Sequence, residues 1–171
     1  QDLDLSQNTI LIFMTDNGTA NGAKFQGLTS EAVQGYNAGM RGKKSSVYEG
    51  GHRVPFFIHW PDGGLVGGRD LKSISAHIDV LPTLAELCGL SLPKSHEPDG
   101  ISFADQLKNL NAPAHRDHLV VQFQGGPYFR GAPMAGEFAC VLKDRWRLID
   151  GKELYDLTED PAQRNDIAAK Y

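Results

Sequence analysis

Two short segments near the N-terminus carry residue types that can bind a metal ion and an anion. Asp16 and Asn17 follow an apolar run, residues 9–15, and Gly18 comes directly after them. Carboxylate and amide oxygens are hard ligands, which suit Ca²⁺ or Mg²⁺ better than soft transition metals. Taken alone, Asp-Asn-Gly is more often a plain turn, so these residues leave both interpretations open.

A pair of lysines, Lys43 and Lys44, follows in a stretch rich in glycine and serine. A lysine ammonium is a compact charge with three donors, which suits the oxygens of sulfate or phosphate. The stretch is not a Walker A loop, because Asn37 stands in place of the first glycine and Lys44 in place of the Ser or Thr. A lysine pair alone suits a solvated surface turn. Together with the neighbouring glycines and the acid at the strand end, it favours an anion site.

The elements that position these residues begin with the apolar run. Residues 9–15 predict a strand that is buried on both faces of a sheet with parallel neighbours. In such sheets ligands bind beyond the carboxyl ends of the strands, where Asp16 falls. The glycine-rich residues 16–53 predict a long loop, and long loops in compact domains are usually functional or disordered. A second apolar strand is expected over residues 54–60.

Capping residues predict three helices after these strands. Asp79 is expected to cap a helix that runs to about Cys88, with Pro82 tolerated in its first turn and Gly89 at its end. Ser102 is expected to cap a short helix over residues 103–109. Later in the chain a last helix is predicted to begin at Asp160-Pro161.

Between these helices the pattern changes to short strands, which indicates a small antiparallel sheet. Strands are predicted over residues 118–123, 137–142 and 145–149. Lys143-Asp144 and Asp150-Gly151 are predicted to form hairpin turns. The Gly/Pro-rich residues 124–134 could border a substrate cleft or form a plain surface loop.

Composition narrows the possible classes of partner. The chain has 171 residues, 40% of them hydrophobic, which is enough to bury a core. A net charge of −4 gives no basic excess for nucleic acid. No apolar run is long enough to cross a bilayer. Cys88 and Cys140 lie in unrelated contexts and are expected to be small core residues.

A series of motifs occurs in order along most of the chain. They are Thr15-Asp16-Asn17-Gly18, Met40-Arg41-Gly42-x-Lys44-x-Ser46-x-x-Glu49-Gly50-Gly51-x-Arg53-Val54-Pro55, His77-Ile78-Asp79-Val80-Leu81-Pro82-Thr83-Leu84, Asp99-Gly100-Ile101-Ser102 and Glu153-Leu154-Tyr155-Asp156-Leu157-x-x-Asp160-Pro161. Together they resemble the C-terminal half of a type I sulfatase, a member of the alkaline phosphatase superfamily. The resemblance implies an α/β fold. Residues 1–98 would be the C-terminal part of the catalytic α/β domain, and residues 99–171 a small antiparallel-sheet subdomain with a covering helix.

The resemblance also implies roles for individual residues. Asp16 and Asn17 match a pair of calcium ligands, and Lys44 matches the catalytic lysine that binds the substrate sulfate. Lys43 is the rival if the loop is shifted by one residue. Glu49 and Arg53 are expected to shape the loop rather than to react.

The nucleophile of the family is absent from this chain. It is a formylglycine made from Cys or Ser in a Cys/Ser-x-Pro-x-Arg motif, and neither Cys88 nor Cys140 begins one. We therefore expect the missing N-terminal half of the same protein to supply the formylglycine and the remaining Ca²⁺ ligands. The isolated chain is expected to be inactive.

By resemblance, the parent protein is expected to hydrolyse sulfate esters of an aryl compound or a carbohydrate, in the periplasm or outside the cell. Its partners would be the sulfated substrate and the missing half, with no nucleic acid and no membrane span. Two alternatives stay open. One is a phosphodiesterase or phosphonate hydrolase of the same superfamily, and the other is a non-catalytic stand-alone domain.

Overall fold

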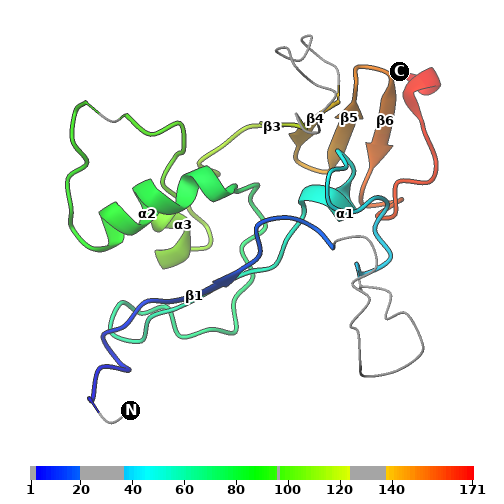
Figure 1. Cartoon of the computed structure of the whole chain (residues 1–171). Coiled ribbons are helices and arrows are strands. Elements are labelled where there is room, and N and C mark those ends of the chain that lie inside the picture. Colours follow the sequence, from blue (N-terminus) through cyan, green and yellow to red (C-terminus); the bar gives the residue numbers. More distant parts are fainter. Residues whose placement is uncertain (1–2, 20–36, 96, 124–137) are drawn as a thin grey trace, which may run out of the picture. The chain divides into compact units, whose positions relative to one another are not determined.

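The computed structural model describes residues 3–19, 37–95, 97–123 and 138–171 (Figure 1). The chain divides into two compact units that interleave along the sequence. The first unit combines Gln1–Met14 with Pro55–Leu119, and the second combines Thr15–Val54 with Val120–Tyr171. Both predicted ligand-binding segments therefore belong to the second unit. The division at residue 98 remains a prediction.

The first unit contains a two-stranded sheet. Strand β1 (Leu11–Met14) pairs antiparallel with β2 (Phe56–His59). The prediction of parallel neighbours and of burial on both faces is wrong, since Leu11 and Phe13 are 64% and 59% exposed. On that exposed face the rings of Phe13 and Phe57 pack together, with centroids 6.1 Å apart. An apolar run indicates a strand, but the elements that cover it decide which face is buried.

The described residues of the first unit also form three short helices: η1 (His77–Asp79), α2 (Val80–Leu87) and α3 (Ala104–Lys108). The helix predicted to run to about Cys88 is confirmed, and Gly89 ends it with a φ of +65°. Asp79 does not cap it as predicted. Its carboxylate instead accepts hydrogen bonds from the backbone N–H groups of Ala76 and Ile101, at 2.9 and 2.8 Å.

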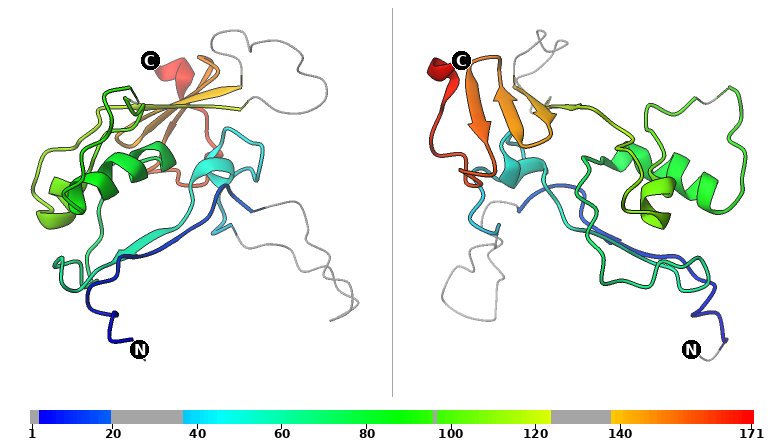
Figure 2. Two further views of the ribbon diagram at one scale, coloured as in Figure 1. Left: turned by 60° about the vertical axis from the view of Figure 1, so that its left-hand side comes forward. Right: turned by 180° about the vertical axis from the view of Figure 1, so that it is seen from behind.

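The second unit contains a four-stranded sheet, in which β3 begins at the boundary between the units (Figure 2). Its strands, in spatial and sequence order, are β3 (Leu119–Gln122), β4 (Ala139–Lys143), β5 (Trp146–Ile149) and β6 (Glu153–Asp156). The last three are antiparallel neighbours, which confirms the predicted small sheet. Both predicted hairpin turns are present, and Asp144 and Asp150 adopt positive φ angles in them.

The predicted helix from Asp160 is wrong. The Asp160 carboxylate accepts the backbone N–H groups of Arg164 and Asn165, at 2.6 and 2.8 Å, and so holds the chain in a turn. Gln163 has a φ of +52°, which does not belong to a right-handed helix. Only the short η2 (Ala168–Lys170) follows.

Each unit has its own buried residues. In the second unit, one helical turn, α1 (Glu49–His52), lies beside the sheet (Figures 1 and 2). Arg147 on β5 donates a hydrogen bond to Glu49 of this turn. Cys140 on β4 is fully buried, and burial raises the pKa of its thiol to about 12. Cys88 is exposed, so the prediction that it is a core residue is wrong.

In the described ranges, no helix has the length and apolar character that a membrane span requires.

Candidate functional site

The structure brings together the two segments that the sequence singled out. The backbone N–H of Gly18 donates to the carbonyl oxygen of Gly51, at 2.9 Å. The N–H of Lys44 donates to the carbonyl oxygen of Thr19, at 3.0 Å. The turn that carries Asp16 and Asn17 is therefore joined by backbone hydrogen bonds to the loop that carries Lys44.

Glycines allow the turn and the loop to approach this closely. A Cβ atom on Gly18 would lie 1.8 Å from the carbonyl oxygen of Gly50. A Cβ on Gly51 would lie 2.0 Å from the oxygen of Ser46, and one on Gly50 would lie 2.4 Å from the oxygen of Gly42. Each distance is far below van der Waals contact, so only glycine fits at these positions.

The loop that carries Lys43 and Lys44 runs from Arg41 to Gly50 and is here called the lysine loop. Backbone hydrogen bonds close it. The N–H of Gly50 donates to the oxygen of Arg41, at 2.8 Å, and the N–H of Ser46 donates to the oxygen of Lys43, at 2.9 Å. Lys43 and Lys44 are both exposed. The described residues supply neither ammonium with a carboxylate partner, so both charges are available to an anion. Their exposure alone does not separate Lys44 from its rival.

Asp16 and Asn17 carry side-chain oxygens of the type that a hard divalent cation takes as ligands. Asp16 is exposed, Asn17 is half-buried, and the described residues place no cationic side chain against the Asp16 carboxylate. Ca²⁺ takes six to eight oxygen ligands. Among the residues that the structure describes, no three His, Cys, Asp or Glu side chains gather into a metal site. A complete shell therefore needs further ligands beyond this pair.

A hollow of about 300 Å³ lies beside the lysine loop. Its lining combines hydroxyl, aromatic and carboxylate side chains, from Ser45, Ser46, Val47, Tyr48, Phe123, Phe138, Ile149 and Asp150. Aromatic faces with a few polar groups are the usual lining of small-molecule sites.

Beneath the loop, Glu49 is almost completely buried and is held by two arginines. Arg147 donates from Nε to Oε1 at 2.6 Å, and Arg53 donates from Nη1 to Oε2 at 3.2 Å. His52 lies nearby, with Nε2 3.2 Å from the oxygen of Val47. Burial lowers the pKa of His52, so its imidazole is neutral at neutral pH. These contacts support the expected loop-shaping role of Glu49 and Arg53.

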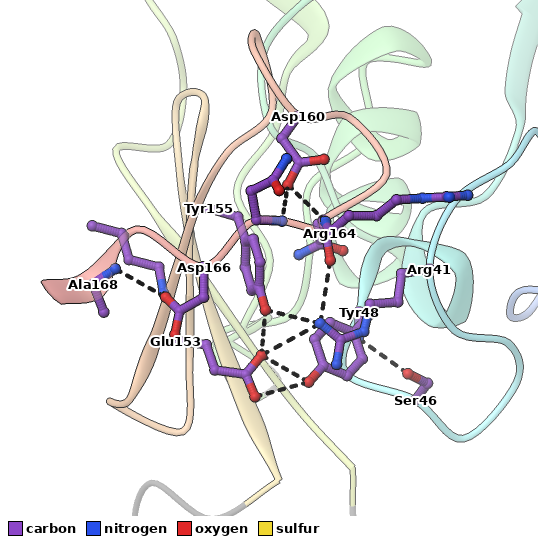
Figure 3. A network of polar contacts seen from close by, with 12 residues as sticks. Arg41, Ser46, Tyr48, Glu153, Tyr155, Asp160, Arg164, Asp166 and Ala168 are labelled. Atoms are coloured by element: carbon purple, nitrogen blue, oxygen red, sulfur yellow. Dashed lines mark hydrogen bonds and ion pairs between the residues drawn. The ribbon is translucent and has the colours of Figure 1, made fainter. Parts of the chain in front are cut away.

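Sequence reasoning missed a cluster of aromatic and charged side chains at the two ends of the loop (Figure 3). The Arg41 guanidinium lies 3.8 Å from the centroid of the Tyr48 ring and donates to the Tyr155 hydroxyl at 2.8 Å. Both tyrosine hydroxyls donate to the Glu153 carboxylate. Burial, together with the hydrogen bond to Glu153, raises the pKa of Tyr155 to about 12. Motif resemblance had singled out Arg41, Glu153 and Tyr155, but no spacing rule indicates that they meet.

Gln163 is the second residue that sequence reasoning missed, and no sequence signal marks it. Its side chain is fully buried, and Oε1 accepts the backbone N–H of Glu49 at 2.8 Å. Its carbonyl oxygen accepts a hydrogen bond from Arg41 Nη1 at 3.2 Å. Gln163 therefore contacts both ends of the lysine loop.

A second buried cluster lies in the first unit. Asp79 is fully buried and faces the Arg116 guanidinium and the His115 imidazole. His115 Nδ1 lies 2.8 Å from Gln106 Oε1, and Gln106 in turn donates to the Ser73 hydroxyl at 2.7 Å. Because the fully buried Asp79 carboxylate is paired with Arg116 and His115, this cluster is structural rather than a ligand site, although Arg116 Nε has no hydrogen-bond partner among the described residues.

A family model described as Sulfatase matches residues 1–90 of the chain. The chain belongs to the sulfatase family. The match includes Asp16, Asn17 and Lys44. It agrees with the resemblance that the motifs carry.

Curated relatives extend the likeness over nearly the whole chain. An N-acetylgalactosamine-6-O-sulfatase of Bacteroides thetaiotaomicron is 27% identical over 99% of this chain and 34% of its own length. A sulfatase of Formosa agariphila is 37% identical over 97% of this chain and 30% of its own length. This member of the sulfatase family thus spans about a third of the length of these relatives.

A solved structure shows that the likeness holds for the fold. It comes from work on glycosaminoglycan metabolism by Bacteroides thetaiotaomicron, and its TM-score is 0.75 at 27% identity. The alignment covers 99% of this chain and 37% of that chain. The mixed α/β architecture with antiparallel sheets is therefore that of a type I sulfatase-like protein.

Proposed function

We propose that this chain forms part of the active site of a sulfate-ester hydrolase. Asp16 and Asn17 would bind Ca²⁺, and Lys44 would bind the substrate sulfate and act as a catalytic residue. The observation that carries the proposal is the pair of backbone hydrogen bonds between the Asp16 turn and the Lys44 loop. They keep oxygen ligands for a cation close to an ammonium for an anion.

The chemistry follows from the charges of these groups. The Lys44 ammonium donates hydrogen bonds to sulfuryl oxygens and stabilises the negative charge that develops on them. A divalent cation, when bound, would supply further positive charge to stabilise the transition state. Asp16 and Asn17 orient that charge, because their turn is attached to the loop that holds the anion.

The substrate we propose is a carbohydrate or aryl sulfate. The Bacteroides relative is named N-acetylgalactosamine-6-O-sulfatase, which supports a sulfated sugar. The hollow beside the loop has aromatic side chains that suit the ring of either substrate.

We assign the nucleophile and the remaining Ca²⁺ ligands to a part of the parent protein outside this chain. Neither cysteine of the chain begins a Cys/Ser-x-Pro-x-Arg motif, so a formylglycine would come from that other part. By family resemblance we place the parent protein in the periplasm or outside the cell.

The test uses the full-length protein that contains this chain, with an aryl sulfate and a 6-sulfated aminosugar as substrates. We expect Ca²⁺-dependent release of sulfate that a chelator abolishes. Asp16→Ala should remove the dependence together with the activity, whereas the exposed Asp62→Ala should retain both. Turnover of phosphonate or phosphate diesters without sulfate-ester turnover would identify the related hydrolase instead. The absence of all hydrolysis, with a folded protein, would favour a non-catalytic domain.

A further inference from the structure

We propose that Glu153, Tyr155 and Gln163, here called the clamp, fix the position of Lys44 by holding both ends of its loop. Glu153 and Tyr155 belong to the C-terminal motif, and Gln163 lies in the turn that follows it. The catalytic consequence of the clamp rests on the proposed function, whereas its effect on the loop does not.

The first end of the loop is held at Arg41. Its guanidinium Nη1 donates to the Tyr155 hydroxyl at 2.8 Å and to the Gln163 carbonyl oxygen at 3.2 Å. The same nitrogen lies 3.6 Å from Glu153 Oε2. All three members of the clamp thus contact one guanidinium (Figure 3 shows Glu153 and Tyr155).

The other end is held at Tyr48 and Glu49. The Tyr48 hydroxyl donates to Glu153 Oε2 at 2.9 Å, and the Glu49 N–H donates to Gln163 Oε1 at 2.8 Å. Tyr155 donates to the same Glu153 oxygen at 2.6 Å, which ties the members of the clamp to one another. Charge-assisted bonds of this kind are shorter and stronger than bonds between neutral groups.

Between these two ends the chain has little freedom. The Gly50 N–H donates to the Arg41 oxygen, and Lys44 is attached to Thr19 through its own backbone. The clamp therefore fixes the loop backbone that carries Lys44, although it does not contact the lysine side chain. Glu153, Tyr155 and Gln163 are positioning residues in this scheme.

The conformation of Gln163 indicates that holding the loop in this position has a cost in free energy. Its φ of +52° lies in the left-handed region, which is uncommon for residues other than glycine. Its buried Nε2 has no hydrogen-bond partner among the described atoms. Such features persist where surrounding contacts over-determine them, and they cluster at functional sites. Here the surrounding contacts are those to Asp160, Arg41 and Glu49.

The first test is hydrogen–deuterium exchange in the full-length protein. Tyr155→Phe removes one hydroxyl and keeps the ring, and Gln163→Ala removes the acceptor for Glu49. We expect the amides of Lys44, Ser46 and Gly50 to exchange at least about tenfold faster in both variants, because the opening free energy of the loop falls. The matched control is Tyr171→Phe, since Tyr171 is 84% exposed and should leave these amides unchanged. Unchanged exchange in Tyr155→Phe and Gln163→Ala would overturn the clamp.

The second test is a double-mutant cycle with Lys44→Ala, measured as kcat/KM for a sulfate ester. Tyr155→Phe alone should lower kcat/KM by about 10-fold to about 100-fold, the scale of a misplaced catalytic group. In the Lys44→Ala background it should have no further effect, because it acts through that lysine. Equal losses in both backgrounds would show a merely structural role and overturn the positioning role. A full-length protein without any sulfate-ester turnover would refute the proposed function, and the exchange experiment would then decide the clamp alone.

Discussion

The carboxylate of Glu49 and the guanidinium of Arg147 form a buried ion pair, with Oε1 and Nε 2.6 Å apart. The two side chains are only 1% and 9% exposed, and they join α1 to β5 across 98 positions of sequence. Removing Arg147 leaves the buried Glu49 carboxylate with the largely exposed Arg53 as its remaining arginine partner, which compensates the charge poorly. We therefore expect Arg147→Met to lower the free energy of unfolding by about 3–5 kcal/mol, measured by urea denaturation.

Arg53 provides the control, because it contacts the same carboxylate from the surface. Its side chain is 63% exposed, so Arg53→Met should lower the stability by no more than about 1 kcal/mol. The double variant Glu49→Gln/Arg147→Met should recover part of the loss. Equal effects of the two arginine replacements would contradict the buried-pair interpretation.

Asp79 is expected to make stability depend on acidic pH. Burial by itself raises the pKa of this carboxyl, but the N–H groups of Ile101 and Ala76 and the Arg116 guanidinium outweigh it and lower the pKa. A lowered pKa means that the carboxylate stabilises the fold above its unfolded pKa of about 3.9, and that this stability is lost as the pH falls through the folded value. The melting temperature should therefore decrease as the pH is lowered below about 4.

Asp79→Asn tests this dependence, since it removes the charge and keeps the shape. The variant should be less stable at neutral pH, and its melting temperature should change less between about pH 5 and about pH 2 than that of the wild type. Asp105, exposed on α3, serves as the control, and Asp105→Asn should keep the wild-type profile. A variant of Asp79 with an unchanged profile would show that other carboxylates cause the acid sensitivity.

The same residue shows how far sequence reasoning reaches. The α2 helix was predictable from local signals, because Gly89 and the apolar spacing act within a few residues. The partners of the Asp79 carboxylate were not predictable, because Ile101 and Arg116 are distant in sequence. The helix predicted from Asp160 failed for a different reason, which is local. The cap-then-proline pattern describes a turn as well as a helix, and the Asp160 hydrogen bonds with Gln163 stabilise the turn.

For the candidate site, the sequence predicted which residues could bind a metal ion and an anion, and the structure shows which residues lie beside them. Asp16 and Lys44 could be singled out because their chemistry is visible in the residue type and motif. That Gly18 and Gly51 join them follows only from the fold. Gln163 could not be found at all, since its role depends on burial and on two loop contacts that no local pattern indicates.

Gly18 should be intolerant of any side chain. A Cβ there would lie 1.8 Å from the Gly50 oxygen, so Gly18→Ala must separate the Asp16 turn from the lysine loop. We expect the variant to lose sulfate-ester turnover in the full-length protein and to bind Ca²⁺ more weakly, measured by isothermal titration. Gly64→Ala is the control, because a Cβ there meets no atom within 4 Å and its positive φ costs only about 1 kcal/mol. Full activity in Gly18→Ala would contradict the close approach of the two segments.

Replacing Lys44 and Lys43 one at a time should show which of the two binds the sulfate. The backbone of Lys44 is bound to Thr19, next to the Asp16 turn, whereas the Lys43 carbonyl oxygen accepts the N–H of Ser46. We therefore expect Lys44→Ala to lower kcat by about 100-fold to about 1,000-fold, the loss seen when one donor to a developing oxyanion is removed. Lys43→Ala should lower kcat by less than about tenfold, because an exposed ammonium that does not contact the sulfate acts only through screened charge.

The measurement is steady-state turnover of an aryl sulfate at low and high ionic strength. Since screening weakens long-range charge, added salt should diminish the Lys43 effect and leave the Lys44 effect in place. The reverse order of losses would assign the sulfate to Lys43 and shift the loop by one residue relative to the expected motif.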